Sequence, residues 1–397
     1  MSMPQAVRHI NAIRAMEAIY RQGAISRASL ARELGLTRST IGNIVAEMVK
    51  DGSVIEVPGG DEAAQPVRTG RPGTLVRLRA DHAAFIGADL GVGEMTVVAI
   101  DLEARTIATL HEAFSVTGLS PDRTIHRLFS LIRKMNNRVG SSHTLRGLCV
   151  TVPGVVDTAG TLVHLPMMGW RDVPLLPRLR AAFPDIPSLL VENDANAFAM
   201  AEHCRAASKL PSHMVHILMD AGVGGAFTVD GRLQRGFRGR EGEIGHIPLG
   251  EKGFLDKTPL HGSLESYVGR DAILARHRFH GGRAKTLTEL LERLAAGTEP
   301  ANATLQDWAL QLGRGLATVT ALFDPGEIVL GGPVSVLFDY SSEAVRRSLE
   351  RYLMPGRPSP QLRRSQLGAD GTALGGAYLL HRRFMSLKNE LVFHGLR

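Results

Sequence analysis

Two polar clusters, separated by a glycine-rich turn, contain residue types that suit the binding of a polyol. The first cluster, VENDAN, occupies Val191–Asn196, and the second, GEIGH, occupies Gly242–His246. The turn between them reads DAGVGG at Asp220–Gly225. Carboxylates and amides pair with neighbouring hydroxyls, whereas glycine turns expose backbone N–H groups that hold phosphates. The pattern predicts a polyol site that could lie next to a phosphate donor.

The first cluster directly follows the apolar run Ser188–Val191, which we expect to form a buried strand. Polar residues at the carboxyl edge of a sheet form the ligand sites of α/β folds. The alternative is a helix cap, because Asn and Asp cap helices well and the sequence from Ala195 is typical of a helix. Capping would occupy only one of the four polar residues, so we favour a ligand site. These residues are Glu192, Asn193, Asp194 and Asn196.

The composition is that of a globular protein with a basic net charge. The 397 residues suffice for two or three domains, with 44% hydrophobic and 21% charged residues and a formal net charge of +7. The two cysteines, Cys149 and Cys204, exclude a disulfide framework and a cysteine-based zinc site. No segment is typical of a signal peptide or a membrane span. We expect a cytoplasmic protein without membrane contact.

The first fifty residues have the spacing of a helix-turn-helix. Apolar residues at helical spacing over Val7–Ile19 predict a first helix that stops at Gly23. A short helix capped by Ser26 or Ser29 and ended by Gly35 comes next, and Thr37 or Ser39 then caps a third. The third helix is expected to enter the major groove of DNA. Its exposed polar residues would be Arg38, Ser39, Thr40 and Asn43.

Two strand-like segments, SVIEV and TLVRLRA, flank a Gly/Pro-rich stretch and predict a wing behind these helices. At the wing tip, Arg71 is placed to reach a minor groove. The alternative is that the N-terminal helices merely cap the next domain, with a disordered loop beside them.

The remaining chain predicts two halves of the type βββαβα, each opening with strands joined by a glycine turn. Such halves indicate a bilobal α/β fold with a cleft between the lobes. Helices are expected over Pro121–Val139 and Leu305–Phe323, and further helices around Ser342–Tyr352 and Thr372–Phe384.

Seven segments in order resemble the ROK family of bacterial repressors and sugar kinases, which has the actin-like ATPase fold. The segments are TGRPG (69–73), VPGVVD (152–157), GWRDVPL (169–175), VENDANA (191–197), GREGEIGHIPLG (239–250), LESY (264–267) and IVLGGPVS (328–335). The likeness covers almost the whole chain, and the winged helix places it beside the family's N-acetylglucosamine, glucose and xylose repressors.

The resemblance implies a winged helix-turn-helix domain at residues 1–80 and a bilobal sugar-binding domain at residues 81–397. One lobe would comprise roughly residues 81–195 with the C-terminal helix 370–397, and the other residues 196–369. The family's sugar contacts correspond to Gly154, Asn193, Asp194, Glu243, His246 and Glu265. In the family's kinases the residue equivalent to Asp194 is the general base; in a regulator it would only bind a hydroxyl.

Both phosphate-binding turns depart from the family pattern. The first reads DLGVG at Asp89–Gly93, with Gly93 in place of the threonine of the kinases. The second reads DAGVG at Asp220–Gly224, without its hydroxyl, and Asp220 adds a carboxylate where phosphate would lie. We therefore expect no kinase activity. Asp89 is present, so metal-assisted phosphate binding is weakened and not excluded.

The family's zinc site combines the GEIGH histidine with three cysteines. Those cysteine positions are here Asp256, Thr258 and Ser263, so a Cys₃His site cannot form and no metal or other cofactor is expected. A substitute built from His246, Asp256 and His261 is conceivable. Pro166-Met167 also replaces the family's Pro-Asn, which bears on the choice of sugar.

The sequence thus predicts a transcriptional regulator, a repressor of carbohydrate uptake or catabolism genes. It would bind an operator as a homodimer or homotetramer and respond to a sugar or sugar phosphate in the cleft. Two alternatives are an ATP-dependent sugar kinase with an accessory DNA-binding domain, and a regulator controlled by a protein partner. ATP binding would favour the kinase.

Overall fold

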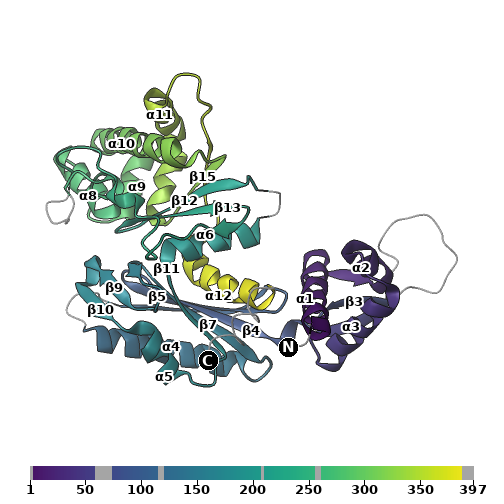
Figure 1. Ribbon diagram of the computed structural model, residues 1–397. Helices are drawn as coiled ribbons and strands as arrows, with labels where there is room; N and C mark the ends of the chain where they lie inside the picture. Colours follow the sequence, from purple (N-terminus) through teal and green to yellow (C-terminus); the bar gives the residue numbers. More distant parts are fainter. Residues whose placement is uncertain (1–2, 59–73, 115–119, 207–209, 255–260, 387–397) are drawn as a thin grey trace.

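The computed structural model describes residues 3–58, 74–114, 120–206, 210–254 and 261–386 and shows a small N-terminal domain beside a two-lobed body (Figure 1). Outside the described residues lie Arg71 at the predicted wing tip, two of the positions that correspond to the family's zinc cysteines (Asp256 and Thr258), and the C-terminal tail. None of the described helices is long and apolar enough to cross a membrane.

The N-terminal domain packs three helices against a three-stranded antiparallel sheet in the order β1-β3-β2. Ser26 caps the second helix and Gly35 ends it with φ 66°, while Thr37 caps the third by accepting a hydrogen bond from Thr40 N. This is the arrangement of a winged helix-turn-helix. Its elements are α1 (Met3–Gln22), β1 (Ala24–Ser26), α2 (Arg27–Leu34), α3 (Arg38–Lys50), β2 (Val54–Pro58) and β3 (Thr74–Leu78).

The first lobe is built on a five-stranded sheet in the order β11-β7-β4-β5-β6. The predicted helix over Pro121–Val139 is observed with these bounds as α4, on one face of the sheet. The remaining elements are β4 (Ala84–Leu90), β5 (Glu94–Asp101), β6 (Thr106–Ala113), β7 (Leu145–Val152), α5 (Leu175–Ala182) and β11 (Ser188–Asn193), with a small sheet of β8 (Val155–Val156), β9 (Leu162–Leu165) and β10 (Trp170–Val173).

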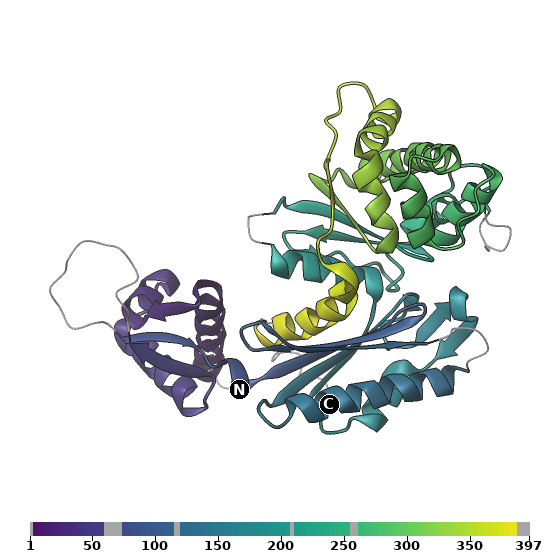
Figure 2. The ribbon, with the colours of Figure 1, turned by 180° about the vertical axis from the view of Figure 1, so that it is seen from behind.

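The second lobe repeats this plan with the sheet order β14-β13-β12-β15-β16, so the prediction of two similar halves is confirmed. Its helices cover the side away from the first lobe, as the view from behind shows (Figure 2). The elements are β12 (His213–Met219), β13 (Val223–Val229), β14 (Arg232–Leu233), α7 (Leu264–Val268), α8 (Arg270–Phe279), α9 (Leu287–Ala295), α10 (Glu299–Phe323), β15 (Glu327–Gly331), α11 (Leu337–Tyr352) and β16 (Gln361–Arg364).

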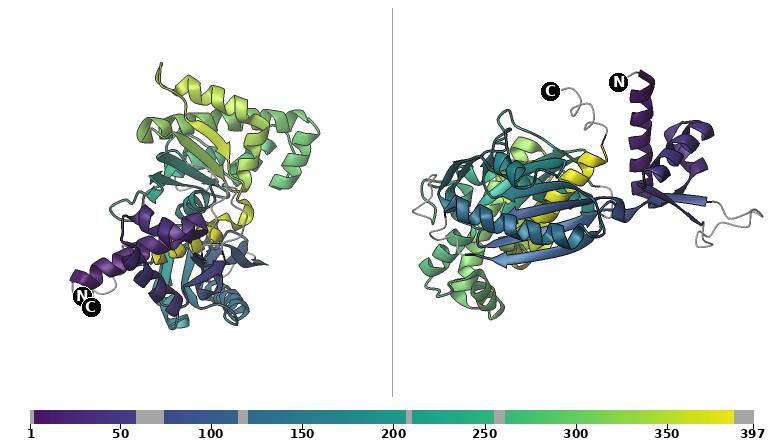
Figure 3. Two further views of the ribbon diagram at one scale, coloured as in Figure 1. Left: turned by 90° about the vertical axis from the view of Figure 1, so that its right-hand side faces the viewer. Right: turned by 90° about the horizontal axis from the view of Figure 1, so that it is seen from below.

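Two helices, α6 (Asp194–Arg205) and α12 (Gly371–Phe384), lie between the lobes and pack against each other. The Cβ of any larger residue at Gly375 would lie 1.8 Å from Ala197 O, so glycine permits their close approach. The far end of α12 reaches the N-terminal domain, where the rings of His381 and Tyr20 lie 5.0 Å apart. Figure 3 shows this domain attached at one end of the first lobe.

Candidate functional site

The Asn193 side chain joins the end of β11 to Gly154, which lies in the connection between β7 and β8. Its Oδ1 accepts hydrogen bonds from Ala195 N and Asn196 N, at 2.9 and 3.2 Å, and so caps α6. Its Nδ2 donates to Gly154 O at 3.2 Å. Asn193 therefore caps α6 and is also one of the predicted sugar contacts. It lies side by side with a second predicted contact, Gly154.

Asp194 begins α6 and lies next to the glycine-rich turn of the second lobe. A Cβ built on Gly224 would lie 4.0 Å from Asp194 Oδ1, which itself accepts from Ala195 N at 2.8 Å. Burial, with repulsion from Asp89 and Asp220, raises the pKa of Asp194 well above its usual range. A carboxyl of this kind can accept or donate a hydrogen bond to a hydroxyl.

Glu265, Glu243 and His246 form a second group on the other side of this turn. Glu265 Oε2 accepts a hydrogen bond from Val223 N at 3.0 Å, which places α7 against the turn. Glu243 Oε2 lies 3.5 Å from His246 Nδ1, and both side chains are exposed. Burial raises the pKa of Glu265. The turn thus lies between Asp194 and Glu265, with side chains that can hydrogen-bond a hydroxyl on both sides.

Met167, from the first lobe, also reaches this turn. A Cβ built on Gly222 would lie 2.7 Å from Met167 Cε and 3.0 Å from Glu265 Oε2. An apolar thioether therefore lies where the family pattern has an amide.

Two residues of the VENDAN cluster, Glu192 and Asn196, form hydrogen bonds within the protein. This corrects the interpretation that all four polar residues of the cluster serve a ligand. Asn196 Nδ2 donates to Glu192 Oε1 at 3.0 Å, and Arg235 Nη1 donates to the same oxygen at 3.0 Å. Arg235 also lies 3.2 Å from Glu241. Glu192 and Asn196 are thus part of a partly buried ion-pair network that holds the segment after β14 against α6.

A cavity of about 490 Å³ adjoins Asp194 and is lined by both phosphate-type turns. Asp89 accepts a hydrogen bond from Thr151 Oγ1 at 2.7 Å, and burial raises its pKa to about 6. Asp220 is bound by Arg270, whose Nη1 lies 2.8 Å from Asp220 Oδ1. Asp89, Asp194 and Asp220 line the cavity together with Arg270 and Arg364, and both guanidiniums are already paired with carboxylates of this chain.

The described residues do not fit the family's zinc. Ser263 caps α7 by accepting from Ser266 N, and its carbonyl accepts from Ser266 Oγ at 2.7 Å. His246 lies beside the Glu243 carboxylate. Within the described ranges, no group of three or more His, Cys, Asp or Glu residues is arranged to hold a metal ion.

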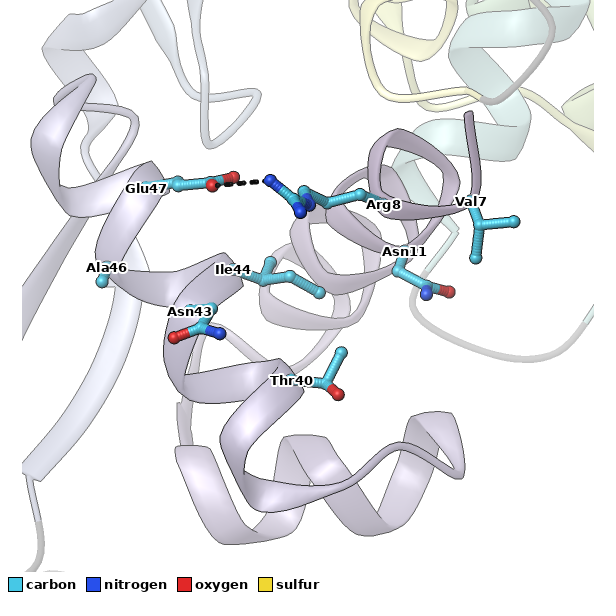
Figure 4. Close-up of a pocket in the computed structure, with 8 residues that line it drawn as sticks. All are labelled: Val7, Arg8, Asn11, Thr40, Asn43, Ile44, Ala46 and Glu47. Atoms are coloured by element: carbon cyan, nitrogen blue, oxygen red, sulfur yellow. Dashed lines mark ion pairs between the residues drawn. The ribbon is translucent and has the colours of Figure 1, made fainter. Parts of the chain in front are cut away.

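The predicted DNA-contacting residues of α3 lie on the surface of the N-terminal domain. Arg38, Ser39 and Asn43 are exposed, whereas Thr40 is half-buried and its hydroxyl lies 2.8 Å from Thr37 Oγ1. Figure 4 shows Thr40 and Asn43 on the wall of a hollow of about 720 Å³ between α1 and α3. The α1 side of this hollow contributes Arg8 and Asn11, which the sequence did not single out.

Comparisons with known proteins agree with this architecture. The ROK family model matches residues 85–383. The xylose repressor of Bacillus spizizenii is 26% identical over 385 residues, 96% of this chain and 97% of that protein. The glucokinase of Streptomyces coelicolor is 27% identical, over 74% of this chain and 96% of the enzyme.

A crystal structure of a ROK family transcriptional regulator, described as a homologue of the E. coli MLC protein, has the same fold. It has a TM-score of 0.79 at 23% identity and covers 98% of both chains. Since the family model covers both lobes and the cleft between them, the chain belongs to the ROK family.

Proposed function

We propose that this protein is a sugar-responsive transcriptional repressor of carbohydrate uptake or catabolism genes. The observation that carries the proposal is the combination in one chain of a winged helix and a cleft with hydroxyl-binding groups. The xylose repressor of Bacillus spizizenii aligns along both features, because its match spans 96% of this chain.

In this proposal Asn193, Asp194, Glu243, His246 and Glu265 bind the sugar hydroxyls, with Gly154 beside Asn193. Asn193 ends β11 and Asp194 begins α6, whereas Glu243 and Glu265 belong to the second lobe. A sugar that contacts both groups binds a closed cleft more tightly than an open one, and this difference shifts the conformational equilibrium.

We further infer that the chain has no kinase activity. An incoming phosphate would meet Asp89, Asp194 and Asp220, and the guanidiniums of Arg270 and Arg364 in the same cavity are already paired with Asp220 and Asp339. In this proposal Asp194 binds a sugar hydroxyl and does not act as the general base that its equivalent is in the family's kinases.

The proposed partners are an operator duplex and a second copy of the chain. Winged helices that read a palindrome bind its two half-sites as a dimer, so a homodimer or homotetramer is the expected form. Closing of the cleft would then change the placement of the two α3 helices.

The test is a DNA-binding titration with a duplex selected by the wild-type protein from random sequence, monitored by fluorescence anisotropy. D-xylose, D-glucose, N-acetyl-D-glucosamine and the 6-phosphates of the two hexoses are added in turn. We expect one sugar to change operator affinity at least about tenfold, and Asp194→Asn to abolish the response while operator binding stays intact. Asp185→Asn, an exposed site on the first lobe, is the matched control.

Sugar-dependent release of ADP from ATP by the wild-type protein, lost in Asp194→Asn, would contradict the proposal and identify a kinase. The absence of any selected DNA would contradict it as well.

A further inference from the structure

Two segments of the second lobe, 247–254 and 261–268, hold each other close to the proposed sugar site. Leu249 N donates to Gly262 O and Leu264 N donates to Ile247 O, both at 2.8 Å. Phe254 N donates to Ser266 O at 2.9 Å. The second segment includes Glu265, and the first follows His246 directly, so their relative placement sets the geometry of the site.

One buried guanidinium contacts both segments. Arg276, on α8, has no exposed surface, and its Nη2 donates to Tyr267 O at 3.0 Å. Its Cζ lies 4.5 Å from the centre of the Phe254 ring, within the range of a cation–π contact. Tyr267 belongs to α7 and Phe254 to the facing segment.

We infer that Arg276 is a positioning residue that fastens these two segments together, where the resemblance to the family implies zinc. Ser263 caps α7, and the His246 ring lies 3.5 Å from the Glu243 carboxylate, as described above. The Arg276 guanidinium adds a side-chain attachment to the backbone hydrogen bonds between the segments, and it contacts both of them. The Tyr267 hydroxyl, which donates to Lys252 O, is a second side-chain link.

The other nitrogens of Arg276 show that this attachment is costly for overall stability. Its Nε and Nη1 have no hydrogen-bond partner, in the part of the chain that the structure describes. Burial lowers its pKa to about 10, so the group remains charged at neutral pH. Replacing an incompletely paired buried charge by an apolar side chain of similar length is often neutral or stabilising.

This reasoning gives Arg276→Met two opposite effects. The thermal midpoint should stay the same or rise, whereas amide hydrogen exchange in residues 247–254 and 261–268 should accelerate about tenfold. The measurement is hydrogen–deuterium exchange by mass spectrometry on the full chain. An unchanged exchange rate in these segments would overturn the inference.

Arg346→Met is the control for the loss of a similar pair of contacts at an exposed arginine. Arg346 also donates to a backbone carbonyl, Leu362 O at 2.8 Å, and its Cζ lies 5.9 Å from the Phe338 ring, in the same lobe. Its replacement should leave residues 247–268 unaffected. Phe254→Leu removes the ring contact and should also accelerate exchange, and it decides the question if Arg276→Met does not fold.

A further measurement distinguishes this attachment from one based on a metal. If Arg276 fastens the segments, incubation with EDTA or with added zinc should leave hydrogen exchange in them unchanged, and elemental analysis should find less than about 0.1 zinc per chain. Stoichiometric zinc, with faster exchange after EDTA, would overturn the inference. The inference concerns the site used in the proposed function. Because these measurements need no sugar or DNA, they can contradict the role of Arg276 without contradicting the proposed function, and the reverse also holds.

Discussion

The imidazole of His381 in α12 lies 5.0 Å from the ring of Tyr20 in α1, and its Nε2 donates to Leu102 O at 2.8 Å. The other end of α12 lines the interlobe cavity through Thr372, beside Asp89. A single helix therefore extends from the cleft to the DNA-binding domain. A change in the cleft that moves α12 would act directly on this joint.

Replacing His381 by leucine should lower the free energy of unfolding by about 1–3 kcal/mol, because the buried carbonyl of Leu102 loses its donor. Urea denaturation at pH 7.5 measures this change. His381→Gln retains a donor of similar reach and should recover part of the loss. Equal losses in both variants would show that ring packing, and not the hydrogen bond, holds the joint.

Asp89→Asn should stabilise the protein at neutral pH by about 1–3 kcal/mol, because burial raises the pKa of Asp89 to about 6. A folded-state pKa above the unfolded value means that ionisation destabilises the fold above that pKa. The difference between wild type and variant should therefore be largest at pH 8 and shrink between pH 6 and pH 4. Urea denaturation at pH 8, 6 and 4 measures it; a variant that is destabilised at every pH would contradict this account.

A double-mutant cycle on Asp220→Asn and Arg270→Gln should give a coupling energy of about 1 kcal/mol or more, since both side chains are half-buried. The exposed pair Glu343–Arg347 is the control, and its coupling should be about 0.3–0.5 kcal/mol. Equal coupling energies in the two pairs would mean that solvent screens the charges in the cavity as strongly as those on the surface.

Arg38→Ala should weaken binding to the selected operator by about 1–3 kcal/mol if this exposed residue contacts a base or phosphate. Anisotropy titrations at two salt concentrations distinguish these roles, because loss of a phosphate contact also lowers the salt dependence. Arg293→Ala, on the far lobe, should leave affinity unchanged. Unchanged affinity in Arg38→Ala would remove this residue from the proposed interface.

Local patterns in the sequence predicted the strongest elements of the fold. The helix α4 has Ser120 as its cap and a face of eight buried residues, seven of them apolar, so its bounds follow from neighbouring residues alone. The strand β1 has only three residues and exists because Ala24–Ser26 pairs with β3, about fifty positions away. The sequence did not indicate β1 or the helices α7, α8 and α9, even though α9 has a strongly amphipathic face and a Thr286 cap.

In the candidate site, too, the sequence predicted what local patterns specify and missed what depends on residues distant in the chain. The resemblance named Asn193 and Asp194; the structure places Asp194 beside the glycine turn and Asn193 against Gly154. The roles of Glu192 and Asn196 depend on Arg235, which follows some forty residues later in the chain. The partner of Asp220 is Arg270, fifty residues away, so no local pattern could reveal that this carboxylate is already paired.

The pair of Asp220 and Arg270 has a consequence for what the protein can sense. In the proposed repressor, ATP could place its phosphates there only by displacing this ion pair, so the cleft would respond to a sugar and not to the adenylate pool. Gene expression would then follow the supply of carbon independently of the energy charge of the cell.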